Sequence, residues 1–86
     1  MKSCTVVVHD VLGLHARPAA QLVEETSRFV CDIALCRYGD EAIIQANVKR
    51  IFDVLELDIR RGERIEFIAD GLDEDAAITA LIKLFA

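Results

Sequence analysis

The segment "LGLHARPAAQLVEETS", residues 12–27, contains the corner where a strand ends and a helix begins. Gly13 permits a sharp turn of the backbone. Pro18 suits the first turn of a helix, because the N–H that proline lacks would have no partner there. The residues that follow repeat with the period of one apolar helix face, and they are Ala19, Leu22, Val23 and Thr26. This spacing predicts an amphipathic helix over 16–27.

Four other segments have the composition and the alternating pattern of β-strands. They are "CTVVVHD" (4–10), "VCDIALCR" (30–37), "EAIIQ" (41–45) and "ERIEFIAD" (63–70). A turn at Tyr38-Gly39-Asp40 would join the second of these strands to the third. Alternate apolar residues, such as Ile33 and Phe67, would then face a common core.

Two more helices are expected toward the C-terminus. Asn47 can cap the first of them, which would stop before Gly62. Its apolar stripe would consist of Val48, Ile51, Phe52 and Leu55. Asp73 can cap the last helix, with acidic residues in the first turn that complement the helix dipole. The buried stripe of this helix would consist of Ile78, Leu81, Ile82 and Phe85.

The predicted order of elements is βαββαβα, and each helix has a single apolar face. Such elements bury their apolar faces most economically in two layers, with the helices on one side of one sheet. We therefore expect an α+β fold with a mostly antiparallel sheet. The 86 residues, 1–86, are enough for a single domain.

The composition excludes several classes of function. A net charge of −5 argues against a nucleic-acid module and against binding to anionic membranes. No apolar run approaches the roughly 18 residues needed to span a bilayer, and the N-terminus lacks the pattern of a secretory signal. Three scattered cysteines indicate free thiols in a reducing, cytoplasmic compartment. Cys31 and Cys36 have no second close pair, so we expect no metal site.

His15 and Arg17 are the candidate reactive residues. The start of a helix presents free N–H groups and attracts anions, while the same field favours a neutral, nucleophilic imidazole. The guanidinium of Arg17 has the fork geometry that phosphoryl oxygens fit. Ala16 and Ala20 are small and leave the imidazole accessible. These features predict a site that accepts a phosphoryl group and hands it on.

Less specific interpretations remain open for the same residues. His15 and Arg17 would also be ordinary at an exposed corner, and Pro18 starts a helix in either case. Lys49-Arg50 is compatible with a solvated face or a partner contact. A small enzyme with His15 as general base is a further alternative, but only Asp10 lies near it in sequence and no substrate pocket is evident.

The motif "GLHARPAA" followed by an amphipathic helix, together with "LELDIRRGE" and "DGLDEDAA", resembles the HPr family of histidine-containing phosphocarriers. The resemblance covers nearly the whole chain and extends to the nitrogen-branch paralogue. It implies an open-faced sandwich of four antiparallel strands under three helices. It also implies that Enzyme I phosphorylates His15 at Nδ1, drawing on phosphoenolpyruvate, and that IIA proteins receive the group. Arg17 would stabilise the phosphate, and Gly13 and Pro18 would frame it.

The resemblance further implies a monomer that has no cofactor and no independent turnover, and that serves sugar transport or regulation through its partners. Its docking surface would combine Ala16, Arg17, Ala20 and Gln21 with Lys49, Ile51 and Phe52. A regulatory module, whose phosphorylation state is read by a non-transport partner, is the alternative function.

Two departures from the family pattern concern regulation and partner choice. Many relatives carry a regulatory serine at the middle helix. Counting back from Gly62 places Arg50 there, and counting forward from Gly39 makes Asn47 the nearest polar cap. Neither residue accepts phosphate from a serine kinase. Glu24 and Glu25 make the first helix acidic where many relatives have lysines, which favours the nitrogen-type or another regulatory branch and partners matched to this chain.

Overall fold

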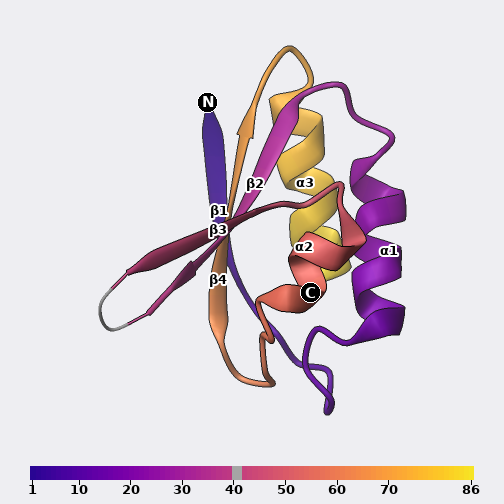
Figure 1. Ribbon diagram of the computed structural model, residues 1–86. Helices are drawn as coiled ribbons and strands as arrows, with labels where there is room; N and C mark the ends of the chain where they lie inside the picture. Colours follow the sequence, from indigo (N-terminus) through magenta and orange to yellow (C-terminus); the bar gives the residue numbers. More distant parts are fainter. Residues whose placement is uncertain (40–41) are drawn as a thin grey trace.

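The computed structural model describes residues 1–39 and 42–86 and has the predicted order of elements (Figure 1). These elements are β1 (Lys2–Val7), α1 (Ala16–Thr26), β2 (Asp32–Tyr38), β3 (Ile43–Asn47), α2 (Ile51–Glu56), β4 (Arg64–Asp70) and α3 (Glu74–Leu84). The expected turn at Tyr38-Gly39-Asp40 and the expected strand start at Glu41 fall partly outside the described residues.

The four strands form one antiparallel sheet in the order β1–β4–β2–β3. Strand β4 pairs with β1 on one side and with β2 on the other, which places Cys4, Phe67 and Leu35 in a row across the sheet. The three helices lie on the same side of this sheet, and its other face is open (Figure 1). The expected two-layer α+β fold, an open-faced sandwich, is confirmed.

The core lies between the sheet and the three helices. Phe67 is fully buried at its centre, and every helix contributes at least one fully buried side chain, the largest of them being Leu22, Val54 and Leu81. The rings of Phe67 and Phe85 are 5.5 Å apart between centroids, in a tilted arrangement. Because all three helices are anchored in one core, the start of α1 has a fixed position relative to α2.

The predicted stripe of helix α3 is confirmed at Ile78 and Leu81, and Phe85 packs partly buried against the core, but Ile82 departs from it. Its buried residues are Ala77, Ile78 and Leu81, whereas Ile82 is 50% exposed. Adjacent helical residues point about 100° apart, at 3.6 residues per turn. Ile82 therefore turns out of the interface that Leu81 fills, and its predicted burial is wrong.

Helix α2 begins later than predicted. The side-chain oxygen of Asn47 accepts the N–H of Lys49 at 3.0 Å, and its carbonyl accepts the N–H of Arg50 at 3.0 Å. These bonds form a separate turn, so Arg50 and not Asn47 is the N-cap of α2. Val48 is buried, but it lies before the helix, and Phe52 is 76% exposed. A helix of only six residues buries a single residue, Val54, and thereby leaves Phe52 outside the core.

Asp73 is the N-cap of α3 by position, but its carboxylate does not cap the helix. Its two oxygens accept the N–H groups of Val30 and Cys31, each at 2.9 Å. Hydrogen bonding by the N–H of Val30 is the largest influence that lowers the pKa of the Asp73 carboxyl below its usual value. Asp73 therefore links the start of α3 to the segment that leads into β2.

Asp73→Asn should lower the melting temperature at about pH 7, because an amide has a single acceptor oxygen and no charge, so one of the two bonds is lost and the other is weakened. A carboxyl group with a lowered folded-state pKa stabilises the fold above its unfolded pKa, and this contribution is lost as pH falls through the folded pKa. The difference in melting temperature between wild type and variant should therefore shrink toward about pH 3. Thermal denaturation followed by circular dichroism measures it, with the exposed Glu24→Gln as control. A difference of equal size at both pH values would contradict this role.

Candidate functional site

His15 lies at the junction between the β1–α1 loop and α1, where it is the N-cap residue of the helix. Its backbone is extended (φ −82°, ψ −170°), and its carbonyl accepts the N–H of Ala19 at 2.9 Å. The helix therefore begins directly after His15, as the proline-containing motif predicts. The ring is partly exposed and lies beside the first turn.

Gly13 and Leu14 anchor the loop that carries His15. The N–H of Leu14 donates to the carbonyl of Ile59 at 2.9 Å, and the N–H of Gly13 donates to the carbonyl of Asp10 at 2.9 Å. Gly13 has φ +74°, and a Cβ there would lie 2.4 Å from the Ile59 oxygen and 2.8 Å from the Arg60 Cα. Only glycine fits both the backbone angle and the space. The predicted sharp turn at Gly13 is therefore confirmed by its geometry.

The first turn of α1 presents free N–H groups to solvent. An α-helix leaves its first N–H groups without internal partners, here those of Ala16 and Arg17, and Pro18 has none to offer. No side chain caps this end. The guanidinium of Arg17 is exposed and, within the part of the chain that the structure describes, forms no ion pair. This end of the helix therefore presents uncompensated positive charge, which suits an anion.

Asp10 contacts the ring of His15, which the sequence analysis did not anticipate. Its Oδ1 lies 3.1 Å from Nε2 of His15 and also accepts the N–H of Leu12 at 3.0 Å. The sequence offered one signal, a short polar residue shortly before a glycine turn, which is typical of a side chain that bonds to the backbone two residues on. That signal predicts the turn but does not show that the turn brings the carboxylate to the imidazole.

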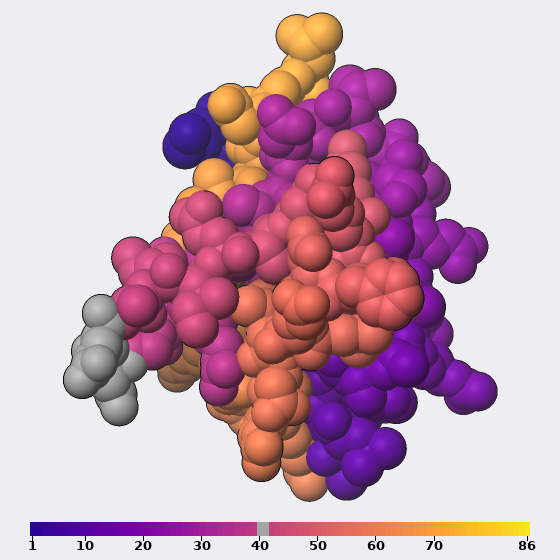
Figure 2. All heavy atoms as spheres, viewed as in Figure 1, coloured from indigo at the N-terminus to yellow at the C-terminus, as the bar shows by residue number. Residues whose placement is uncertain are grey.

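Exposed side chains surround His15 on one face of the molecule. Ala16, Ala20 and Gln21 are exposed on α1, and Phe52 is exposed on the neighbouring α2. Figure 2 shows the start of α1 beside the residues of α2 on a continuous surface. Val11 and Leu12, in the loop before His15, are also largely exposed and were not among the expected contact residues. Ile51 is half-buried against the core.

Lys49 differs from the other expected contact residues. Its ammonium group donates to the carbonyls of Phe29 and Cys31, at 2.6 and 2.8 Å. It is thus engaged in holding the segment before β2. The neighbouring Arg50 is exposed and, among the described residues, has no ion-pair partner. The basic contribution of this region to a partner surface therefore comes most directly from Arg50.

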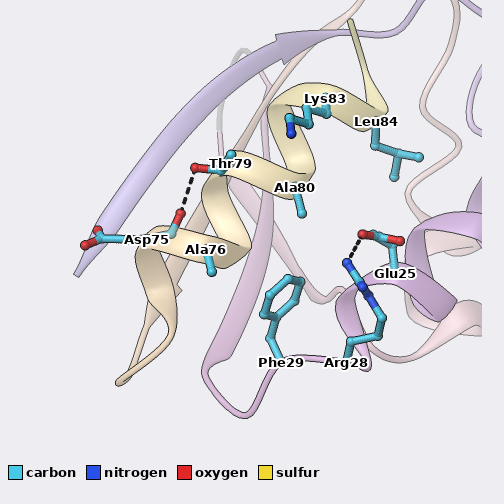
Figure 3. A pocket seen from close by; sticks show the side chains of 9 residues that line it. All are labelled: Glu25, Arg28, Phe29, Asp75, Ala76, Thr79, Ala80, Lys83 and Leu84. Atoms are coloured by element: carbon cyan, nitrogen blue, oxygen red, sulfur yellow. Dashed lines mark hydrogen bonds and ion pairs between the residues drawn. The ribbon is translucent and has the colours of Figure 1, made fainter.

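One surface groove lies away from His15, and a smaller hollow lies next to His15, lined by residues on both sides of it in the chain. Figure 3 shows a groove between α1 and α3, with the Arg28–Glu25 ion pair on one side and Ala80 pointing into it from α3. This groove adjoins the C-terminal end of α1, whereas His15 precedes its first residue. A smaller hollow beside the loop is lined by Val8, His9, Asp10, Gly13, Leu14, Pro18, Leu84, Phe85 and Ala86. Neither hollow includes His15 or Arg17 in its lining.

The three cysteine thiols lie in surroundings that favour their protonated form. Burial is the largest influence that raises the pKa of the Cys31 thiol to about 11, and it also raises those of Cys4 and Cys36. A raised pKa keeps a thiol protonated and unreactive. Over residues 1–39 and 42–86, no cluster of three or more potential metal ligands is found. In the same residues, no helix has the length and apolar character needed to cross a membrane.

The fold and the site together define a small α+β domain with a partly exposed histidine at the start of its first helix. The PTS-HPr family, described as the PTS HPr component phosphorylation site, matches residues 2–86. The chain therefore belongs to the HPr family, the phosphocarrier proteins of the phosphotransferase system.

Individual relatives agree with this assignment. The chain is 36% identical to the phosphocarrier protein HPr of Mycoplasma genitalium over 81 residues, which cover 94% of this chain and 89% of the relative. It is 40% identical to HPr of Treponema pallidum, with 94% and 88% covered. The solved structure of a Mycoplasma histidine-containing phosphocarrier protein matches with a TM-score of 0.87 at 35% identity, covering 96% and 90%.

Gly13→Ala should destabilise the protein more than Gly62→Ala. Both glycines have positive φ, but a Cβ on Gly62 meets nothing within 4 Å. The free energy of unfolding of Gly62→Ala, the control, should therefore fall only by the conformational cost of about 1–2 kcal/mol. That of Gly13→Ala should fall further, because its Cβ clashes with the backbone. Urea denaturation of both variants measures the difference. Equal losses would show that the contact with Ile59 and Arg60 does not require glycine.

Proposed function

We propose that His15 is the residue of this phosphocarrier that is phosphorylated. The observation that carries the proposal is its place at the uncapped N-terminus of α1, next to the free N–H groups of Ala16 and Arg17. Phosphorylated Enzyme I would supply the group, originally from phosphoenolpyruvate, and IIA proteins would accept it. The chain turns over no small molecule by itself, and it works in the cytoplasm.

The transfer requires little chemistry from the protein. The lone pair of Nδ1 of His15 attacks the phosphorus of the phosphohistidine on Enzyme I. The new P–N bond forms as the donor's P–N bond breaks, and the electron pair of that bond stays on the donor nitrogen. The N–H groups at the start of α1 and the guanidinium of Arg17 stabilise the charge on the phosphoryl oxygens. Transfer to a IIA protein follows the same steps with the roles exchanged.

The exposed face around His15 is the proposed docking surface for both partners. It comprises Ala16, Arg17, Ala20 and Gln21 on α1 and Phe52 on α2, with Ile51 beneath it and Lys49 and Arg50 beside it. Exposed aromatic side chains are frequent anchors in interfaces. We propose that the chain acts as a monomer, because each transfer needs this face free for the next partner. Gly13 and Pro18 frame the site by fixing where α1 begins.

Wild-type protein incubated with its own Enzyme I and phosphoenolpyruvate should gain one phosphoryl group, measured as intact mass under mildly alkaline conditions. His15→Ala should gain none, whereas His9→Ala, which removes the other histidine, should be labelled normally. Arg17→Ala should slow labelling by roughly 10- to 100-fold, as expected for the loss of a charged hydrogen bond. Arg28→Ala, at the other end of α1, is its control. Label that persists in His15→Ala would disprove the assignment.

Phe52→Ala should weaken the interaction with Enzyme I by roughly fivefold or more, because truncation of an interface anchor costs about 1 kcal/mol or more. The free energy of unfolding should change little, since the side chain is 76% exposed. The apparent KM for Enzyme I in the labelling reaction measures the effect. Leu72→Ala is the matched control, because Leu72 is fully exposed in the β4–α3 connection. An unchanged KM in Phe52→Ala would contradict the proposal that α2 is part of the docking surface.

A further inference from the structure

We propose that Asp10 is a positioning residue that fixes the tautomer of His15, so that the proton stays on Nε2 and the lone pair on Nδ1. This inference rests on the proposed function in one respect, namely that the free lone pair of Nδ1 attacks phosphorus. The tautomer itself is a property of the unphosphorylated protein. The three sequence motifs that carry the family resemblance do not include Asp10, which lies before "GLHARPAA".

The carboxylate of Asp10 is held in place by the loop around it. Its Oδ1 accepts the N–H of Leu12 at 3.0 Å, and the carbonyl of Asp10 accepts the N–H of Gly13 at 2.9 Å. The loop is tied in turn to the α2–β4 connection by the bond from Leu14 to Ile59. The same Oδ1 lies 3.1 Å from Nε2 of His15. The carboxylate therefore reaches the ring from a fixed position and does not depend on a freely rotating side chain.

The contact determines which ring nitrogen carries the proton. An ionised carboxylate only accepts hydrogen bonds, so the nitrogen that faces it must be the donor. In a neutral imidazole one nitrogen carries the proton and the other has the lone pair. With the proton on Nε2, the lone pair is on Nδ1. Because the remaining nitrogen is not engaged by Asp10, it is free to attack phosphorus.

The arrangement also fits the product of the transfer. When Nδ1 bonds to phosphorus, the proton on Nε2 stays where it was, so the step requires no proton transfer. The phosphorylated ring then gains positive character, and the carboxylate of Asp10 lies against the nitrogen that bears the proton. A hydrogen bond between two groups that are both charged is stronger than one between neutral groups. Asp10 thus supports both the nucleophile and the phosphorylated ring, and it never touches the transferred group.

Nitrogen-15 NMR of the His15 ring tests the tautomer directly, before any phosphorylation. In the wild type at a pH where the ring is neutral, Nε2 should have the shift of a protonated nitrogen and Nδ1 that of an unprotonated one. In Asp10→Ala both shifts should move toward averaged values. Asp10→Asn retains an oxygen that can accept from Leu12 and Nε2, so it should stay close to the wild type and shows that the turn survives. Glu24→Gln controls for the loss of one negative charge.

The rate of labelling by phosphorylated Enzyme I is the second measurement. Asp10→Ala should lower kcat roughly tenfold with little change in KM, because one charged hydrogen bond to the ring is lost while the docking surface is intact. Asp10→Asn should recover part of this loss. Wild-type shifts and rates in Asp10→Ala would overturn the proposal, and so would a wild-type ring with Nδ1 protonated. Failure of Enzyme I to label the wild type would instead refute the proposed function, while the NMR result would still decide the tautomer.

Discussion

The N–H of Leu14 donates to the carbonyl of Ile59 at 2.9 Å, and the position of His15 depends on this bond. The bond joins the β1–α1 loop to the α2–β4 connection, two segments that are more than forty residues apart in the chain. Gly13 lets the two backbones approach so closely, since any Cβ there would overlap with Ile59 and Arg60. His15 follows directly, and α1 begins at the next residue. The contact thus aligns three features at once: the imidazole, the free N–H groups of the helix and the exposed surface of α2.

The opposite end of the sandwich is stabilised by a different set of charges. Asp73 accepts two N–H groups from Val30 and Cys31, and the ammonium of Lys49 donates to the carbonyls of Phe29 and Cys31. The segment before β2 is therefore held on both sides by charged groups with satisfied hydrogen bonds. Beside His15, by contrast, Arg17 is exposed without an ion-pair partner among the described residues. Lys49 and Asp73 thus stabilise the fold at one end, and a basic side chain is left unpaired at the other, in a protein with a net charge of −5.

The features that local sequence controls were predicted well. The first helix was expected over 16–27 and is found at Ala16–Thr26, because its proline and its apolar period act within a few residues. Errors arose where burial depends on distant partners. Phe52 and Ile82 are apolar residues of helices, yet which face a helix buries is decided by what packs against it. Asp73 has the sequence of a helix cap, but the nearby N–H groups of Val30 and Cys31 compete for its carboxylate. The site could be proposed from the sequence because its main residues are contiguous, whereas the contact of Asp10 exists only after the loop has folded.

A carrier must release the phosphoryl group as readily as it accepts it, and the distribution of charge around His15 fits this requirement. Positive character lies on the side of the helix start, from the N–H groups and Arg17, and in the proposed function it would stabilise a phosphate at Nδ1. The negative charge of Asp10 lies across the ring at Nε2, where it stabilises the ring and does not compete for the phosphate. The groups proposed to hold the phosphate are exposed, so solvent would weaken each interaction. An enclosed pocket with the same groups would bind the phosphate more tightly and oppose its transfer onward, which gives a physical reason for a reactive histidine at the surface of a domain of 86 residues.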